Sequence, residues 1–137
     1  MKKRLATLLL LLSTCAFSAN LHYSLIKKES GKEGHTLLIV GGIHGDEPGA
    51  YFAPMLLAKH YKIESGNVWV VPNLNFDSIV KNSRGSYGDM NRKFAKIESK
   101  DKDFEIITDI KKLLLTPKVD LILNLHDGKG FYREQTI

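Results

Sequence analysis

The sequence predicts an α/β fold with a mixed, largely parallel sheet and helices on both faces. Three short apolar runs, 36–40, 67–71 and 119–125, are typical of strands that are buried on both faces. Segments with the apolar spacing of helices, at about 48–60 and 101–115, separate these runs. Alternation of strand and helix favours right-handed crossovers between parallel strands, and hence a sheet covered by helices.

The remaining segments complete this outline. Weak alternation over 21–27 indicates an edge strand, and the glycines within 30–34 predict a hairpin turn. Pro48 suits the first turn of the first helix. The polar stretch 73–95 is predicted to be a long loop, which in a compact domain usually serves a function. Ligands of such sheets bind outside the carboxyl ends of the strands.

The first residues have the pattern of a secretory signal peptide. A basic start, the apolar run 8–12 and a small-residue exit predict removal of residues 1–19, and the run is too short to span a membrane. The rest, 20–137, then carries 17 basic against 15 acidic residues. This small excess of positive charge does not indicate a nucleic-acid-binding surface. The only cysteine, Cys15, leaves with the signal peptide. We therefore expect a periplasmic protein without disulfides and without a stable membrane anchor.

Two imidazoles and one carboxylate follow the predicted strands. His44 and Glu47 lie in the turn after 36–40, and His126 directly follows 119–125. These are the usual three protein ligands of a catalytic zinc ion, with a fourth position open for water. Alone, Glu47 would be an acidic residue that favours a helix N-terminus, and His126 a strand-end histidine bonded to backbone. Together they favour a metal and indicate hydrolysis. Three further histidines are interpreted as surface residues: His22, His35 and His60.

The loop 73–95 contains a second group of polar residues. Arg84 and Arg92 could perform different tasks, one gripping a substrate carboxylate and the other stabilising a developing oxyanion. Asp89 could accept a hydrogen bond from a ligand imidazole. The alternative interpretation is a solvated basic loop, and the arginines alone do not decide between the two.

Taken in order, these residues resemble the zinc carboxypeptidase family that includes pancreatic carboxypeptidase A. The motif consists of His44-x-x-Glu47, Arg84, Asp89-Met90-Asn91-Arg92 and His126. Segments 41–49 and 126–133 are similar to one branch, the periplasmic peptidoglycan DL-carboxypeptidases that set cell shape in helical bacteria. That branch can carry Gln as the first zinc ligand, where this chain has His.

The resemblance implies a role for each residue of the motif. Zn²⁺ would be bound by His44, Glu47 and His126. The terminal carboxylate of the substrate would be bound by Arg92 with the help of Asn91. Arg84 would polarise the scissile carbonyl, and Asp89 would orient His44. The implied substrate is a muropeptide tripeptide stem, from which terminal meso-diaminopimelate is released to leave a dipeptide.

One feature departs from the family pattern. The family's general base is a Glu on a later strand, whereas the sequence ends at Ile137, 11 residues past His126, and Glu134 is too close to His126 to match. We therefore expect 20–137 to be the N-terminal portion of a zinc carboxypeptidase catalytic domain, a fragment or a frameshifted product. Without the base, catalysis would be much slower, and exposed sheet edges predict poor solubility.

Two alternatives remain open. A zinc-dependent N-acyl amino acid amidohydrolase of the desuccinylase and aspartoacylase type shares a similar His-Gly-x-Glu turn and Asn-Arg pair, although the signal peptide argues against a cytosolic enzyme. The other alternative is a non-catalytic remnant that binds zinc or peptidoglycan.

Overall fold

A computed structural model describes residues 22–128 of the chain. The predicted signal peptide, Glu134 and the end of segment 126–133 lie outside the described residues. In chain order, the elements are β1 (Ile26–Glu29), β2 (Thr36–Val40), α1 (Pro48–His60), β3 (Asn67–Val71), α2 (Phe76–Val80), α3 (Met90–Lys93), α4 (Phe104–Leu114) and β4 (Leu121–Asn124).

The four described strands form one sheet in the order β1-β3-β2-β4. β2 runs parallel to both β3 and β4, and β1 is antiparallel to β3. The predicted fold class, a mixed and largely parallel α/β sheet, is confirmed. No helix within residues 22–128 combines the length and the apolar character that crossing a membrane requires.

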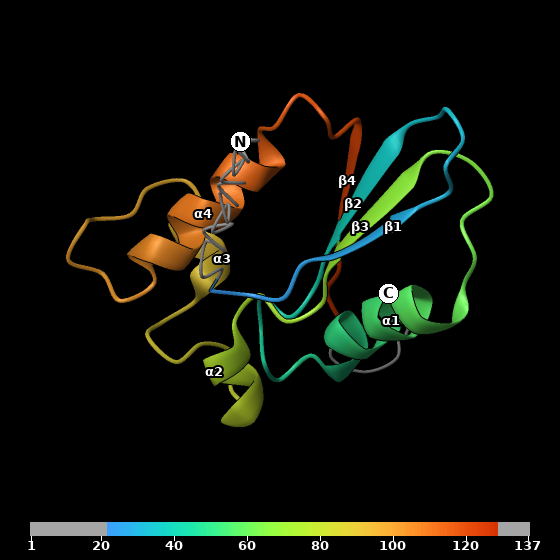
Figure 1. Ribbon diagram of the computed structural model, residues 1–137. Helices are drawn as coiled ribbons and strands as arrows, with labels where there is room; N and C mark the ends of the chain where they lie inside the picture. Colours follow the sequence, from blue (N-terminus) through green and yellow to red (C-terminus); the bar gives the residue numbers. More distant parts are fainter. Residues whose placement is uncertain (1–21, 129–137) are drawn as a thin grey trace, which may run out of the picture.

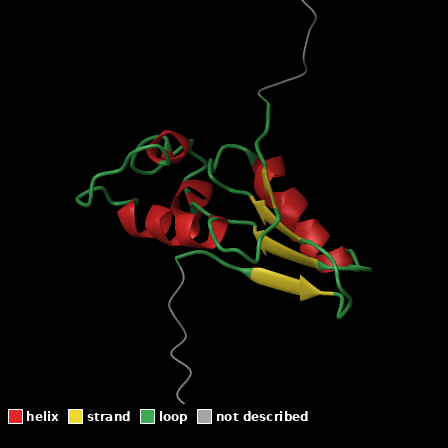
Figure 2. Cartoon of the chain, turned by 90° about the horizontal axis from the view of Figure 1, so that it is seen from above, coloured by secondary structure: helices red, strands yellow, loops and turns green. Residues whose placement is uncertain are grey.

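The two crossovers leave the sheet in opposite directions. From β2 the chain passes through α1 to β3, and from β3 it returns through α4 to β4 on the other side of β2. Right-handed crossovers of this kind place their helices on opposite faces, as Figures 1 and 2 show for α1 and α4. The carboxyl ends of β2 and β4 therefore flank a topological switch point, where α/β proteins bind ligands.

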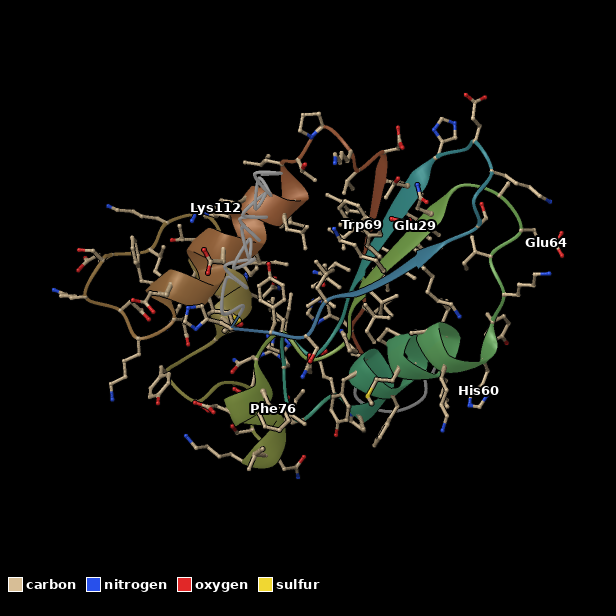
Figure 3. The ribbon with its side chains drawn as sticks, viewed as in Figure 1. Glu29, His60, Glu64, Trp69, Phe76 and Lys112 are labelled. Atoms are coloured by element: carbon tan, nitrogen blue, oxygen red, sulfur yellow. The ribbon has the colours of Figure 1, made fainter. Side chains whose placement is uncertain are left out.

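The main core lies between the sheet and α4. Alternate residues of the strands face this side, because successive side chains of a strand point to opposite faces. Ile107 and Ile110, one turn apart on α4, are fully buried against them. Burying each of these side chains contributes about 2 kcal/mol. The strand residues of the core are Leu38, Val40, Trp69 and Val71, and Figure 3 shows Trp69 on the sheet.

The antiparallel edge strand β1 is tied to the end of α1. The Lys28 ammonium group donates hydrogen bonds to the carbonyl oxygens of Ala58, at 2.7 Å, and of Tyr61. Carbonyls at a helix C-terminus lack hydrogen-bond donors inside the helix and carry partial negative charge. A lysine there donates the missing hydrogen bonds and balances that charge.

The prediction of a hairpin turn at 30–34 is wrong. β1 pairs with β3 rather than with β2, and the segment after β1 crosses the start of β3. There Ser30 N donates to Gly66 O at 3.1 Å, and Asn67 N donates to His35 O at 2.9 Å. Glycines allow the chain to reverse locally, but they do not determine which strand pairs with β1. β3, apolar on both faces, takes the place between β1 and β2.

The last predicted strand is shorter and less buried than expected. β4 covers Leu121–Asn124, and Leu121, Ile122 and Leu123 are 57%, 41% and 42% exposed. These residues are exposed because β4 lies at the edge of the sheet, where among the described residues it pairs with β2 alone. The second helix is also shorter than the predicted 101–115, and the predicted loop 73–95 contains the short helices α2 and α3.

Candidate metal site

The turn after β2 brings His44 into the interior at the carboxyl end of the sheet. His44 is 1% exposed, and its neighbour Gly45 donates from its backbone N to Ser83 O at 2.9 Å. A Cβ at Gly45 would lie 1.9 Å from the Ser78 carbonyl oxygen, so only glycine allows the turn to pack this closely against α2. The close packing fixes the direction in which His44 points.

Glu47, at the start of α1, joins the two histidines. Its Oε1 lies 2.7 Å from His44 Nδ1 and 3.3 Å from an amino group of Arg84. Its Oε2 lies 2.8 Å from His126 Nδ1 and accepts a hydrogen bond from Asp127 N at 3.1 Å. Burial raises the pKa of Glu47, but the hydrogen bonds from His44 and His126 outweigh burial and hold the pKa below its ordinary value. The carboxylate is therefore ionised at neutral pH.

Asp89 lies on the opposite side of the His44 ring. Its Oδ1 is 2.9 Å from His44 Nε2, and its Oδ2 accepts a hydrogen bond from Arg84 Nε at 3.1 Å. Partial burial alone would raise the pKa of Asp89, but the hydrogen bonds from His44 and Arg84 lower it to about 2. Arg84 thus spans both acidic groups of the cluster, Glu47 and Asp89.

The donor set fits a bound cation. Ligand atoms of His44, Glu47 and His126 lie within 4.8 Å of one another. Both ring nitrogens of His44 face carboxylates, which only accept hydrogen bonds, so without an ion only the doubly protonated ring satisfies both. A cation at Nδ1 would replace one proton and leave Nε2 to donate to Asp89. Two imidazoles and one carboxylate suit zinc, with one coordination position left open.

The segment that follows β4 supplies the second histidine. Leu125 N donates to Val40 O at 2.9 Å, and His126 follows with its ring centroid 4.9 Å from that of His44. Asp127 Oδ2 then accepts a hydrogen bond from Gly49 N at 2.7 Å, which ties the end of β4 to the first turn of α1. His126 is exposed, in contrast to His44.

Two side chains beside His126 were not among the predicted site residues. Asn124 Nδ2 lies 3.2 Å from His126 Nε2, and Asp127 contacts both Glu47 and Gly49. Their positions next to His126 could have indicated this. At the end of a strand, alternate side chains and the residues of the following turn face the same site.

The predicted carboxylate-binding pair lies on α3 at the edge of this cluster. Arg92 Nε is 3.9 Å from Asp89 Oδ2, and the Arg92 side chain is 84% exposed. Asn91 donates from its backbone N to Asp89 Oδ1 at 3.0 Å. Asn91 and Arg92 interact with Asp89 and form no hydrogen bond or ion pair with His44 or His126, so their roles in substrate binding stay predictions. His22, His35 and His60 lie at the surface.

A mixed α/β sheet with His, Glu and His at its switch point has the donor set of a metal-dependent hydrolase. The chain belongs to the family described as "Carboxypeptidase controlling helical cell shape catalytic" (Peptidase_M99), whose profile matches residues 2–137.

Solved structures of Csd4 agree with this family, and the chain is also similar to a deacetylase. Apo cell shape determinant protein Csd4 from Helicobacter pylori is 42% identical with a TM-score of 0.77, over 84% of this chain and 29% of that chain. The mDAP-bound form of Csd4, described as a D,L-carboxypeptidase, is 46% identical with a TM-score of 0.71, over 79% and 27%. N-alpha-acetyl-L-2,4-diaminobutyric acid deacetylase from Halomonas elongata is 34% identical over 101 residues, which are 70% of this chain and 29% of that protein. The chain thus spans less than a third of the length of these relatives.

Proposed function

We propose that this chain is the metal-binding part of a zinc-dependent D,L-carboxypeptidase that trims peptidoglycan peptide stems in the periplasm. The observation that supports it best is the convergence of His44, Glu47 and His126, from two strand ends, on one point. The predicted signal peptide supports the location. Since the chain spans 29% of the Csd4 chain, peptide hydrolysis is proposed for the whole catalytic domain, and zinc binding for this chain.

Each residue of the site has a proposed role. Zinc would be held by His44, Glu47 and His126, and when bound it polarises a carbonyl and activates water. Asp89 would hold the His44 ring in one orientation, because its Oδ1 faces Nε2 at 2.9 Å. Arg84 would face the substrate carbonyl.

The proposed substrate is a peptidoglycan tripeptide stem. A tripeptide stem ending in meso-diaminopimelate carries a terminal carboxylate, and Arg92 with Asn91 would bind it through charge-assisted hydrogen bonds. The mDAP-bound form of Csd4 supports this choice of substrate. Arg92 has the exposure that an incoming ligand needs.

Metal analysis of the purified protein tests the site. We expect one zinc per chain, and loss of zinc in the double variant His44→Ala, His126→Ala. The matched control is His35→Ala, His60→Ala, which also removes two imidazoles but from the surface. Equal zinc content in the site variant and the wild type would reject the proposal.

A second candidate is deacylation of N-acyl amino acids, favoured by the 34% identity with the Halomonas elongata deacetylase. Incubation of the whole catalytic domain with tripeptide muropeptide and with N-acetyl-diaminobutyrate, followed by mass spectrometry, separates the two. Release of diaminopimelate supports the carboxypeptidase, and release of acetate and diaminobutyrate without diaminopimelate supports the deacylase. Binding of muropeptide without release of any product would indicate a non-catalytic role.

A further inference from the structure

Helix α1 begins at a candidate metal ligand, which leaves its N-terminus without a local cap. The first N–H groups of a helix have no acceptor inside the helix, and a Ser, Thr, Asp or Asn at the N-cap position usually provides one. Glu47 occupies this position, but its side chain caps no N–H group of the helix. Its two carboxylate oxygens face His44 and His126 instead, at 2.7 Å and 2.8 Å. The N-cap residue therefore serves the metal site rather than the helix.

The cap of α1 comes from a distant part of the chain. In the first turn, Pro48 has no N–H group, and Ala50 N donates to Glu47 O at 3.1 Å. Gly49 N lies between them, and this turn contains no acidic residue that could accept its hydrogen bond. The acceptor is Asp127, 78 residues further along the chain, whose Oδ2 lies 2.7 Å from Gly49 N. The segment that follows β4 thus caps α1.

Asp127 contacts the Glu47 side chain as well as the helix. Its backbone N donates to Glu47 Oε2 at 3.1 Å, and this is the same oxygen that faces His126. Its carboxylate accepts the hydrogen bond from the backbone two residues after Glu47. One residue therefore holds Glu47 at two points, and that residue directly follows His126 in the sequence.

The contact between Asp127 and α1 is close and electrostatically favourable. An added Cβ at Gly49 would lie 2.6 Å from Asp127 Oδ1 and 3.1 Å from Oδ2, so the carboxylate needs the room that glycine leaves. The N-terminus of a helix carries partial positive charge, which a carboxylate stabilises. Both the packing and the charge therefore favour an acidic side chain at position 127.

We propose that Asp127 is a positioning residue of the metal site, which caps α1 in place of Glu47 so that the Glu47 carboxylate can reach both histidines. Its side chain acts on the helix and its backbone N–H acts on Glu47, so it works through Glu47 rather than as a ligand. Partners of this kind contribute about tenfold to 100-fold to metal affinity. The inference rests on the proposed zinc site.

Zinc affinity, measured by competition with a chelator, tests this role. We expect Asp127→Ala to lower the affinity by about tenfold or more, because α1 loses its cap and Glu47 its orientation. Asp127→Asn keeps an oxygen that can accept from Gly49 N, so its affinity should lie closer to the wild type than to Asp127→Ala. The matched control is Lys28→Met, which removes the side chain bound to the opposite end of α1 and should leave zinc affinity unchanged.

Hydrogen exchange in the presence of EDTA checks the contact without zinc. The Gly49 amide should exchange faster in Asp127→Ala than in the wild type or in Lys28→Met. Circular dichroism shows whether each variant is folded, and mass spectrometry excludes deamidation in Asp127→Asn. If Asp127→Ala does not fold, Gly49→Ala takes its place, because it disturbs the same contact from the helix.

Two results overturn the inference while leaving the zinc site intact. One is equal zinc affinity of the wild type and Asp127→Ala. The other is an equal loss of affinity in Asp127→Asn and Asp127→Ala, which would indicate that the Asp127 carboxylate itself binds the ion. A wild-type chain that binds no zinc would instead reject the proposed site, and this inference with it.

Discussion

At the residue scale, Glu47 joins the two histidines of the candidate metal site. Its two oxygens face different histidines, at 2.7 Å and 2.8 Å, and those histidines are separated by most of the described chain. The side chain is only 7% exposed, so its hydrogen bonds act with little competition from solvent. Glu47 was predicted as a ligand together with the two histidines at the strand ends, whereas its contact with Arg84 required the tertiary structure.

Asp89→Asn should weaken zinc binding without unfolding the protein. The change removes the negative charge that faces His44 Nε2 and Arg84 Nε while keeping the size of the side chain. Loss of such a partner typically costs about tenfold to 100-fold in metal affinity. A chelator competition titration measures the effect, and Asp77→Asn, on the exposed surface of α2, is the control. Unchanged affinity in Asp89→Asn would contradict the role of Asp89.

Gly49→Ala should disturb the contact between α1 and the residue that follows His126. A Cβ at Gly49 would lie 2.6 Å from Asp127 Oδ1, so the Asp127 carboxylate must move and its hydrogen bond with Gly49 N is disturbed. We expect weaker zinc binding than in Gly128→Ala, where an added Cβ meets no atom within 4 Å. Equal zinc affinity of the two variants would show that the contact between Gly49 and Asp127 does not position His126.

At the scale of elements, the local sequence pattern predicts some helices and strands, whereas other features of the fold depend on tertiary packing. Pro48 and the apolar runs placed α1, β2 and β3 correctly, because helix starts and strands buried on both faces have strong local signals. The partner of β1 and the exposure of β4 could not be predicted, since both depend on which strands lie alongside. The short helices α2 and α3 lack a hydrophobic period long enough to detect.

A lysine between two carboxylates fixes α3 to the start of α4. Lys93 Nζ lies 2.8 Å from both Asp101 and Asp103, and also donates to Tyr87 O at 2.7 Å. The Lys93 and Asp103 side chains are only 14% and 6% exposed. Lys93→Met should destabilise the fold by about 2 kcal/mol, because it leaves a buried carboxylate without its partner. Lys112→Met, at an exposed pair with Asp109, should cost about 0.5 kcal/mol or less in the same denaturant titration.

The same cluster predicts a pH dependence of stability. Hydrogen bonds from Lys93 and from the backbone of Asp103 lower the pKa of Asp101. Burial lowers the pKa of Lys93, but the hydrogen bonds to Asp101 and Asp103 outweigh burial and raise it. The stabilisation by Asp101 is present above its unfolded pKa of about 3.9 and is lost as the pH falls further; that by Lys93 is present below about 10.4 and is lost as the pH rises further.

Denaturant titrations of the wild type and Lys93→Met across this range measure the effect. We expect the stability difference between the two proteins to be largest near neutral pH and to shrink towards both extremes. A difference that is constant from acidic to alkaline pH would contradict this account.

At the scale of the whole molecule, zinc should stabilise the fold. An ion that binds the native state alone adds RT ln(1 + [L]/Kd), about 2.7 kcal/mol at a free concentration of 100 times Kd. We expect a higher unfolding midpoint with zinc, reversal by EDTA, and a smaller shift in Glu47→Gln. A midpoint that does not respond to zinc in the wild type would argue against binding to the folded chain.

The route of the chain through the sheet has a consequence for how the protein matures. His44 and Glu47 are in place once β2 and α1 have formed, but His126 arrives only when the final described strand has been laid down beside β2. Until then a bound ion would have two protein ligands rather than three. Tight retention of metal during synthesis or refolding would therefore report that β4 has paired with β2.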